Sequence, residues 1–291
     1  MMESSSLISD FCPLEVRRAV PADEEAIRRL LIRSRRPYVC SWWWEEALGA
    51  ETFLLALVEG HPVGALLALR DAGPTAWVRL GALTSEIPTG LWLDATLPHL
   101  WAPLGVQGAR MLAWTDVGSW LGEPLRVRGF QPLTRLINLV KRDFSLPVLP
   151  PGFPCSIRPG EAKDVPELAC LDHEAFPPPW WFSATTLERI LQETACFLVA
   201  EWEGILIGYI EARWAEWGAH IGRLAVAPPF QGQKVGAQLL AVVLSRLWEM
   251  GVRDITLNTQ EDNIPSQRLY QKFGFLPAGQ RIVVWSRSIP E

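Results

Sequence analysis

The two halves of this chain repeat one another in sequence, and this repeat limits the folds that the chain can adopt. Residues 53–69 read FLLALVEGHPVGALLAL and recur at 197–213 as FLVAEWEGILIGYIEAR, sharing the frame F-L-x-A-x-x-E-G-x-x-x-G. GFQP (129–132) recurs as GFLP (274–277), and each half opens on a Val-Arg or Ile-Arg pair followed by an aspartate. The three matches keep their order and nearly one offset, about the length of an ordinary domain. The repeat predicts a tandem duplication.

A proline-rich stretch marks the joint between the halves. SLPVLPPGFPC (145–155) holds four prolines and a glycine, which suppress regular structure. We therefore expect one domain at 1–146, a linker at 147–154 and a second domain at 155–291.

The second half alternates strand and helix patterns. A hairpin pattern turns at Glu203-Gly204, and a helix pattern with one apolar face runs from Gly236 to Met250. Further strands are expected at 220–227, 253–259 and 280–288, with a helix at 265–273. This order predicts an α/β protein in which each half has a central, mixed and largely antiparallel sheet flanked by helices.

Composition excludes several classes of partner. The net charge of −5 gives no electrostatic case for nucleic acid or an anionic membrane, and no apolar run is long enough to span a bilayer. MMESSSLISD lacks the basic and apolar regions of a signal peptide. Scattered cysteines, odd in number and never in a C-x-x-C pair, argue against disulfides and a zinc site and favour the cytoplasm (Cys12, Cys40, Cys155, Cys170 and Cys196). The sequence leaves the oligomeric state open.

The stretch PPFQGQKVGAQLL (228–240) places a short glycine-containing loop directly before a helix. Free backbone N–H groups and the helix dipole at such a place can bind phosphate without a basic side chain. Gly232 and Gly236 would allow close approach of an anion, and Ala237 adds little bulk. Taken alone, the loop fits an ordinary strand-to-helix turn equally well.

A second string, NIPSQRLYQKFGF (263–275), follows one strand later. Together the two strings resemble the GNAT superfamily, the Gcn5-related N-acetyltransferases. The loop partly matches that family's [R/Q]-x-x-G-x-[G/A], at Gln231 and Gly236, and the second string matches its N-x-x-S-x-x-L-Y-x-K-x-G-F throughout. The resemblance covers about residues 155 to 290.

This resemblance implies a fold in which two central parallel strands splay apart and acetyl-CoA lies in the gap. It implies that the pantetheine arm binds the backbone of Leu224–Val226 and that the pyrophosphate binds the amides of Gly232–Ala237. No metal is expected. The cofactor-binding residues implied in this way are Leu224, Ala225, Val226, Gln231, Gly232, Gln233, Lys234, Val235, Gly236, Ala237, Asn263, Ser266 and Tyr270.

Lys234 stands where many family members have glycine. We expect a negative φ there, because a lysine at positive φ is uncommon. Its ammonium would then add charge beside the phosphates or extend into solvent.

The implied reaction is attack of a neutral amine on the thioester carbonyl within a ternary complex. A backbone N–H of the strand can stabilise the oxyanion, and we choose Val226. The family places Tyr270 to protonate the departing thiolate, whereas packing behind Phe275 is the alternative.

The sequence does not assign the general base to one residue. His220 stands six residues before Val226, where some family members carry a glutamate, although it could equally be an inert edge-strand residue. Asn258 occupies the position of a glutamate in the ribosomal-protein-type members and cannot act as a base. Glu211, Glu216 or a water chain are the reserve candidates.

The aromatic loop FPPPWWFSATT (176–186) resembles the loop that shapes the acceptor site in the same subgroup. Trp180 and Trp181 are candidate acceptor contacts, together with Glu211; the alternative is that the loop packs on the core as a hydrophobic clasp. The neighbouring Asp172-His173-Glu174 is not expected to bind metal, because successive helix residues face different ways.

The first half lacks both strings. At the place of the loop it reads SEIPTGLWLDATLPHL (85–100), without a glycine-rich turn, and Arg126 stands near the position of the tyrosine. We therefore expect a degenerate domain without CoA. The sequence as a whole predicts an N-acetyltransferase that acts on a protein N-terminus, a lysine or a small amine. The alternatives are a non-catalytic acyl-CoA-binding sensor or scaffold and an enzyme that uses a longer acyl-CoA.

Overall fold

The computed structural model describes residues 14–34, 37–39, 43–216, 218–279 and 281–290. Cys12, Cys40, Trp42 and the N-terminal stretch discussed above lie outside these ranges. The chain divides into two compact units. Of the described residues, those up to Arg70, Pro74–Leu133 and those from Val283 onward form unit 1, whereas Asp71–Gly73 and Thr134–Ile282 form unit 2.

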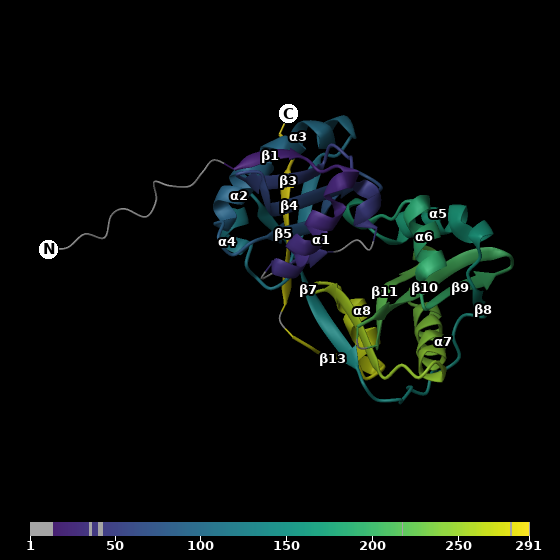
Figure 1. The fold of residues 1–291 in the computed structure, drawn as a ribbon. Coiled ribbons are helices and arrows are strands. Elements are labelled where there is room, and N and C mark those ends of the chain that lie inside the picture. The colour runs from purple at the N-terminus through teal and green to yellow at the C-terminus, as the bar shows by residue number, and fades with distance from the viewer. Residues whose placement is uncertain (1–13, 35–36, 40–42, 217, 280, 291) are drawn as a thin grey trace. The chain divides into compact units, whose positions relative to one another are not determined.

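Unit 2 is a sheet in the order β8-β9-β10-β11-β12-β7, with helices on both faces (Figure 1). Helices α5 and α6 contact strand β10 on one face, and α7 packs against β9, β10 and β11 on the other. Its elements are β7 (Gln131–Lys141), β8 (Ser156–Pro159), α5 (Val165–Ala175), α6 (Ala184–Glu193), β9 (Cys196–Trp202), β10 (Ile205–Ala215), β11 (Gly218–Val226), α7 (Val235–Glu249), β12 (Asp254–Gln260), α8 (Ile264–Lys272) and the short β13 (Leu276–Pro277) beside β7.

Local sequence accounts for the ends of several of these elements. The β9–β10 hairpin turns at Glu203 and Gly204, both at positive φ, as the strand twist of a tight hairpin requires. Ser183 begins α6 by accepting a hydrogen bond from the amide of Thr186 at 3.1 Å. The turn agrees with the sequence prediction, whereas α6 begins inside the stretch 176–186 that the sequence predicts as a loop.

Strands β11 and β12 are parallel but stay paired for only four residues. The register runs from Gly218 opposite Asp254 to Ile221 opposite Leu257 and then stops, although the strands continue to Val226 and Gln260. A bulge in the β10–β11 ladder lies at the same level, where Glu211 pairs with Arg223 and Ala212 with Ile221, which leaves Gly222 as the extra residue. The expected splayed parallel pair is confirmed.

Unit 1 repeats the architecture with the sheet order β1-β3-β4-β5-β6-β14 and β2 beside β5. The parallel pair β5 and β6 is again joined only at its start, from Thr75 opposite Met111 to Trp77 opposite Ala113. The elements are β1 (Glu15–Arg18), α1 (Glu24–Arg33), β2 (Tyr38–Val39), β3 (Phe53–Val58), β4 (His61–Arg70), β5 (Thr75–Leu83), α2 (Thr89–Thr96), α3 (Pro98–Val106), β6 (Met111–Asp116), α4 (Gly122–Arg126) and β14 (Ile282–Ser288).

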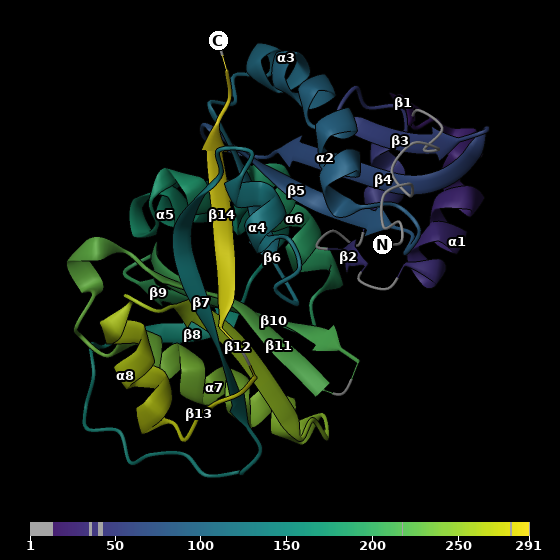
Figure 2. The ribbon, with the colours of Figure 1, turned by 90° about the vertical axis from the view of Figure 1, so that its left-hand side faces the viewer.

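The last strand of each half of the sequence pairs in the unit that is formed mainly by the other half. Strand β7 ends the first half of the sequence, yet it pairs with β12 in unit 2, with Leu139 opposite Leu257. Strand β14 ends the chain, yet it pairs with β6 in unit 1, with Trp285 opposite Trp114. Figure 2 labels both strands along their lengths. The proline-rich stretch is thus the covalent joint between the halves, while the compact units are discontinuous in sequence.

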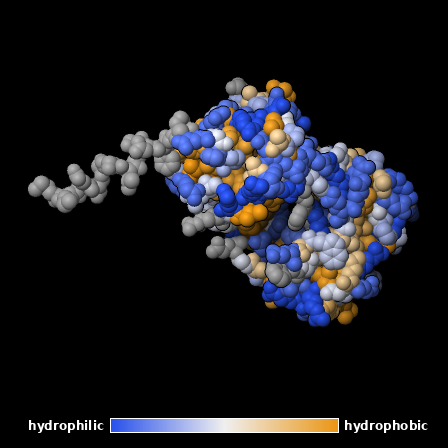
Figure 3. Space-filling view, in the orientation of Figure 1, coloured by the Kyte–Doolittle hydropathy of each residue, from blue (hydrophilic) through white to orange (hydrophobic). Residues whose placement is uncertain are grey.

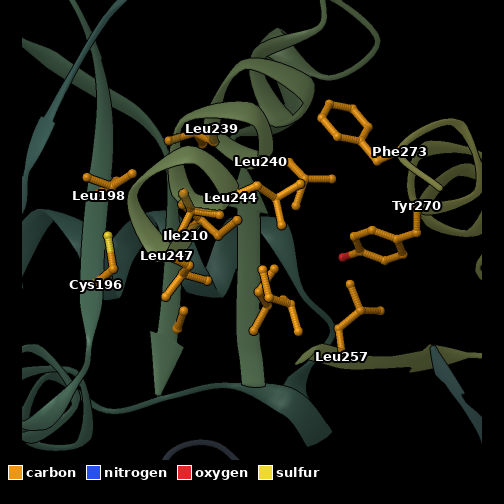
Figure 4. Close-up of a cluster of buried hydrophobic side chains, with 14 of the residues drawn as sticks. Cys196, Leu198, Ile210, Leu239, Leu240, Leu244, Leu247, Leu257, Tyr270 and Phe273 are labelled. Atoms are coloured by element: carbon orange, nitrogen blue, oxygen red, sulfur yellow. The ribbon is translucent and has the colours of Figure 1, made fainter. Parts of the chain in front are cut away.

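Each unit has its own apolar core. In unit 2 the core lies between the sheet and helices α7 and α8, where the leucines of α7 meet Ile210, Leu257 and Tyr270 (Figure 4). In the view of Figure 3, hydrophilic residues are spread over the surface among smaller apolar groups. Within the described ranges, none of the helices is long and apolar enough to cross a bilayer.

Candidate active site

The candidate phosphate loop joins the end of β11 to the start of α7. After one turn of 3₁₀ helix, η5 (Pro228–Phe230), the chain passes through four exposed residues before α7 begins at Val235. The Gln231 amide donates to the carbonyl of Val226 at 2.9 Å, and the Gln233 amide donates to that of Pro229 at 2.7 Å. The two glutamine side chains therefore stiffen the loop from within.

The expected negative φ of Lys234 is wrong. Lys234 has φ 70° and ψ 9°, so it adopts the left-handed conformation that glycine adopts without steric cost. Its ammonium donates to the carbonyl of Pro151 at 2.9 Å. The chain has to turn sharply into α7 at this position, and the lysine accepts the unfavourable backbone conformation while its side chain bonds the proline-rich stretch.

Gly236 stands where the first turn of α7 faces the separated strands. A Cβ placed on it would lie 3.6 Å from Val226 Cγ2 and 3.8 Å from methyl carbons of Leu224 and Leu269. Any larger side chain would extend into the space beside these residues. The absence of a side chain keeps that space open.

The second string, NIPSQRLYQKFGF, contains α8. Asn263 caps the helix by accepting a hydrogen bond from the amide of Ser266 at 3.2 Å. Tyr270 is buried, and its ring meets that of Phe275 edge to face at 5.8 Å. Figure 4 shows its hydroxyl directed away from α8, toward α7 and the sheet. Burial raises the pKa of Tyr270 to about 12, so the phenol keeps its proton at neutral pH.

His220 lies on β11 within the last paired residues before the strands separate. Thr256 Oγ1 donates to the carbonyl of Ala219 at 3.3 Å, so His220 Nδ1, 3.0 Å from the same oxygen, is the donor in their hydrogen bond. Nε2 is left as an acceptor and lies 3.4 Å from the side-chain amide nitrogen of Asn258. Burial, with a smaller effect of the Arg213 cation, lowers the pKa of His220 to about 4. The imidazole is therefore neutral at pH 7.

Glu211 is fully buried beside the bulge. Its Oε1 accepts from Arg213 at 2.7 Å, and it lies so close to Gly222 that a Cβ there would be only 2.2 Å away. Burial raises the pKa of Glu211, against the opposing effect of Arg213 and Arg223. Glycine at the bulge thus makes room for a buried carboxyl group. Glu216 is exposed at the end of the β10–β11 hairpin.

The aromatic loop is held by its own contacts and by α5. The Trp181 ring stacks on His173 at 4.6 Å, and its indole N–H donates to the carbonyl of Phe176 at 2.8 Å. His173 Nε2 lies 3.0 Å from the carbonyl oxygen of Phe182. Trp180 is half-buried in the short 3₁₀ turn η4 (Pro178–Trp180). These contacts tie the loop to α5 and to itself.

Sequence reasoning missed a buried ion pair between β11 and α5. Arg223 of β11 binds Asp172 of α5 at 2.6 Å, and both side chains are almost completely buried. A charged residue inside an otherwise apolar strand pattern was the available signal. For Asp172, by contrast, no local signal in the sequence points to this partner. In the described part of the chain, His, Cys, Asp and Glu side chains form no group that could hold a metal ion.

The candidate residues form two groups. Leu224 and Val226 pack toward the core that contains Tyr270 and α7, so the phosphate loop and Tyr270 belong to that face. Arg223 points toward α5, on the opposite face of the sheet. Glu211 and the aromatic loop lie on that same face. The bulge at Gly222 is where the two groups are nearest along β11.

Comparison with known proteins places this arrangement among acetyltransferases. Residues 163–275 match the model of the Acetyltransferase (GNAT) family. An uncharacterized N-acetyltransferase of Methanocaldococcus jannaschii is 30% identical over 121 residues, which are 41% of this chain and 76% of that protein. A candidate ribosomal protein bS18-alanine N-acetyltransferase of Bacillus subtilis is 29% identical over 126 residues, 43% of this chain and 83% of that protein.

Solved structures extend the likeness of the fold to nearly the whole chain. A tandem GNAT protein from the clavulanic acid biosynthesis pathway has a TM-score of 0.66 at 19% identity, covering 96% of this chain and 99% of that one. A GCN5-related N-acetyltransferase of Sphaerobacter thermophilus has a TM-score of 0.65 at 19% identity, covering 96% of each chain.

Proposed function

Because the chain belongs to the acetyltransferase (GNAT) family, we propose that unit 2 transfers the acetyl group of acetyl-CoA to a primary amine. The observation that carries this proposal is the separation of β11 from β12 after Ile221, directly before the loop that enters α7. The separated strand edge offers backbone groups to a linear ligand, and the loop offers amides to its phosphates.

In this proposal the pantetheine arm binds the backbone of Leu224–Val226, where β12 no longer pairs. The pyrophosphate binds the amides from Gly232 to Ala237. Gly236 leaves room for the arm beside Val226 and Leu269, as its surroundings indicate. Asn263 and Ser266 contribute through the start of α8, whose geometry the cap between them fixes. The cofactor supplies an activated thioester.

The amine attacks the thioester carbonyl, so that a C–N bond forms, the C–S bond breaks, and the nitrogen, positively charged after attack, loses one proton to water. The backbone N–H of Val226 stabilises the oxyanion. Tyr270 gives its proton to the departing thiolate and regains one from solvent, in keeping with a phenol that is protonated at neutral pH.

The pKa of His220 changes the role that we assign to it. An imidazole with a pKa of about 4 is too weak a base to deprotonate an alkylammonium ion in water. We propose instead that its unprotonated Nε2 accepts a hydrogen bond from an amine that arrives neutral or that loses its proton through water. The acceptor is then a protein N-terminus, a lysine or a small amine, presented near Trp180, Trp181 and Glu211.

We further propose that unit 1 binds no CoA. A Cβ on Gly81 of β5 would lie 3.0 Å from the ring of Trp114 on β6, so this indole reaches across the separated strands. Trp92 of α2 packs against it edge to face at 6.0 Å. Side chains thus occupy in unit 1 the place that the cofactor takes in unit 2. We also propose a cytoplasmic location, which the odd number and the scatter of the five cysteines along the sequence support.

A screen for acetyl-CoA consumption with N-terminal peptides, lysine peptides and small amines tests the proposal. We expect turnover with one class, and a fall of roughly a hundredfold in kcat with unchanged acetyl-CoA affinity in Tyr270→Phe. Tyr38→Phe, a similarly buried tyrosine of unit 1, is the matched control. Binding of acetyl-CoA without turnover on any amine would favour a sensor, and preference for a longer acyl-CoA would change the donor.

A further inference from the structure

Arg223 is buried within the strand that would bind the pantetheine arm. Its Nε and Nη2 donate to both carboxylate oxygens of Asp172 at 2.6 to 2.8 Å, and 8% of its side chain is exposed. The Tyr209 hydroxyl donates to the same carboxylate at 2.5 Å. A buried ion pair with several hydrogen bonds fixes the position of whatever else its groups bind.

Arg223 and Asp172 also bind the aromatic loop. Arg223 Nη2 donates to the carbonyl of Trp180 at 2.5 Å, and Asp172 Oδ1 accepts from the amide of Phe182 at 2.9 Å. The guanidinium lies 3.8 Å from the ring centroid of Phe176 and 4.0 Å from that of Phe182. The Arg223 guanidinium therefore contacts the rings at both ends of residues 176–182 and a carbonyl between them.

The loop has particular need of such contacts. Three consecutive prolines, 177–179, provide no amide donors, so this stretch can form few backbone hydrogen bonds of its own. The bulge at Gly222 shifts the alternation of β11, which turns Arg223 toward α5 while Leu224 and Val226 face α7. The same strand thus contacts the loop with one residue and faces the cofactor side with the next.

We propose that Arg223 is a positioning residue that fixes the acceptor loop, residues 176–183, relative to the cofactor-binding strand. The inference rests on the proposed function, since it assumes that the amine binds against this loop. Attack on a thioester requires the two reactants to be aligned closely, and a displaced loop would bind the amine poorly while leaving acetyl-CoA binding intact.

Lysine cannot replace arginine in this role. A lysine ammonium cannot bind both carboxylate oxygens and the Trp180 carbonyl in one plane, nor can it stack between two rings as a guanidinium does. Arg223→Lys therefore keeps the charge and removes the geometry. The double variant Asp172→Leu with Arg223→Met removes both buried charges together, so it avoids leaving one of them unpaired.

Hydrogen exchange on the full chain tests the contact without reference to activity. In Arg223→Lys and in the double variant, we expect amides of residues 176–183 to exchange at least roughly tenfold faster, with those of α7 unchanged. Arg158→Lys is the matched control, because Arg158 also binds an aspartate through two nitrogens, Asp164 at 2.7 and 3.0 Å, but on β8. Unchanged protection of the loop in both variants would overturn the proposal.

Kinetics then separate positioning from a general structural role. With the amine that the wild-type enzyme acetylates, we expect the acceptor KM to rise roughly tenfold or more in both variants, while the acetyl-CoA dissociation constant changes by less than about twofold. An equal loss for both substrates, or full rescue by lysine, would overturn the positioning role. A wild-type protein that acetylates no amine would instead contradict the proposed function, and the exchange experiment would still decide the contact.

Discussion

Lys234 holds a left-handed backbone conformation while its ammonium binds the carbonyl of Pro151 at 2.9 Å. The same stretch is tied to the loop at two further points, because the Phe153 amide donates to the carbonyl of Gln233 at 3.0 Å and the Gln238 side chain donates to that of Phe153 at 3.1 Å. The Phe153 ring packs edge to face against those of Trp202 and Phe230. Residues 151–153 are therefore part of the support of the candidate phosphate loop.

This relationship predicts that Lys234→Gly stabilises unit 2. Glycine removes a backbone cost of about 1 to 2 kcal/mol for a non-glycine residue at positive φ, against the loss of one exposed hydrogen bond and the higher entropy of glycine when unfolded. We expect a net gain of about 0.5 kcal/mol in the free energy of unfolding, measured in urea. Lys234→Ala keeps the backbone cost and loses the bond, so it should be less stable than the wild type. A glycine variant no more stable than the alanine variant would contradict this account.

One cofactor per chain is the second prediction. Titration of the full chain with acetyl-CoA in a calorimeter should give a stoichiometry near one, because we propose that the Trp92 and Trp114 rings fill the equivalent place in unit 1. Gly236→Val should raise the dissociation constant at least roughly tenfold, a loss of about 1.4 kcal/mol, by filling the space beside Val226. Gly105→Val, at an exposed glycine of α3 with nothing within 4 Å of its Cβ position, is the control. Two sites of equal affinity would show that unit 1 is not degenerate.

The third prediction concerns His220. Its folded-state pKa of about 4 lies below the usual 6.5, so the unfolded chain binds this proton more readily. The stabilising contribution of the neutral imidazole is complete above pH 6.5 and declines as the pH falls toward 4, where it is lost. We expect proton NMR to give a titration midpoint near 4 for His220, well below the usual histidine value of about 6.5.

Urea unfolding provides the thermodynamic counterpart. Between pH 7 and pH 4.5 the wild type should lose more stability than His220→Gln, by a difference on the order of 2 kcal/mol. Equal losses in the two proteins, or a midpoint near 6.5 for His220, would restore the imidazole as a candidate general base.

The reach of the sequence can be judged from particular residues. The alternating patterns were sufficient to predict a mixed sheet flanked by helices and the turn at Glu203-Gly204, because each depends on local sequence. The splayed parallel strands were predicted only from the family resemblance of the two strings. Arg223 and Asp172 are 51 positions apart, and nothing in the local pattern pairs them. The left-handed Lys234 was missed because its conformation is imposed by the turn into α7 and opposes its intrinsic preference. The pairing of β7 with β12 and of β14 with β6 could not be predicted either. Because the two halves are similar, each last strand has two equivalent sheet edges with which it could pair.

That pairing yields the last prediction. Trp285 lies near the end of the second half, but it is 8% exposed in the core of unit 1, opposite Trp114 of β6. Trp285→Ala should therefore destabilise unit 1, by about 3 to 5 kcal/mol for a large buried ring, and hydrogen exchange should rise in β6 and α4. Trp214→Ala, at a tryptophan of β10 that is 55% exposed, should leave both units protected. If the loss of protection in Trp285→Ala were confined to α7 and α8, β14 would belong to the sheet of its own half.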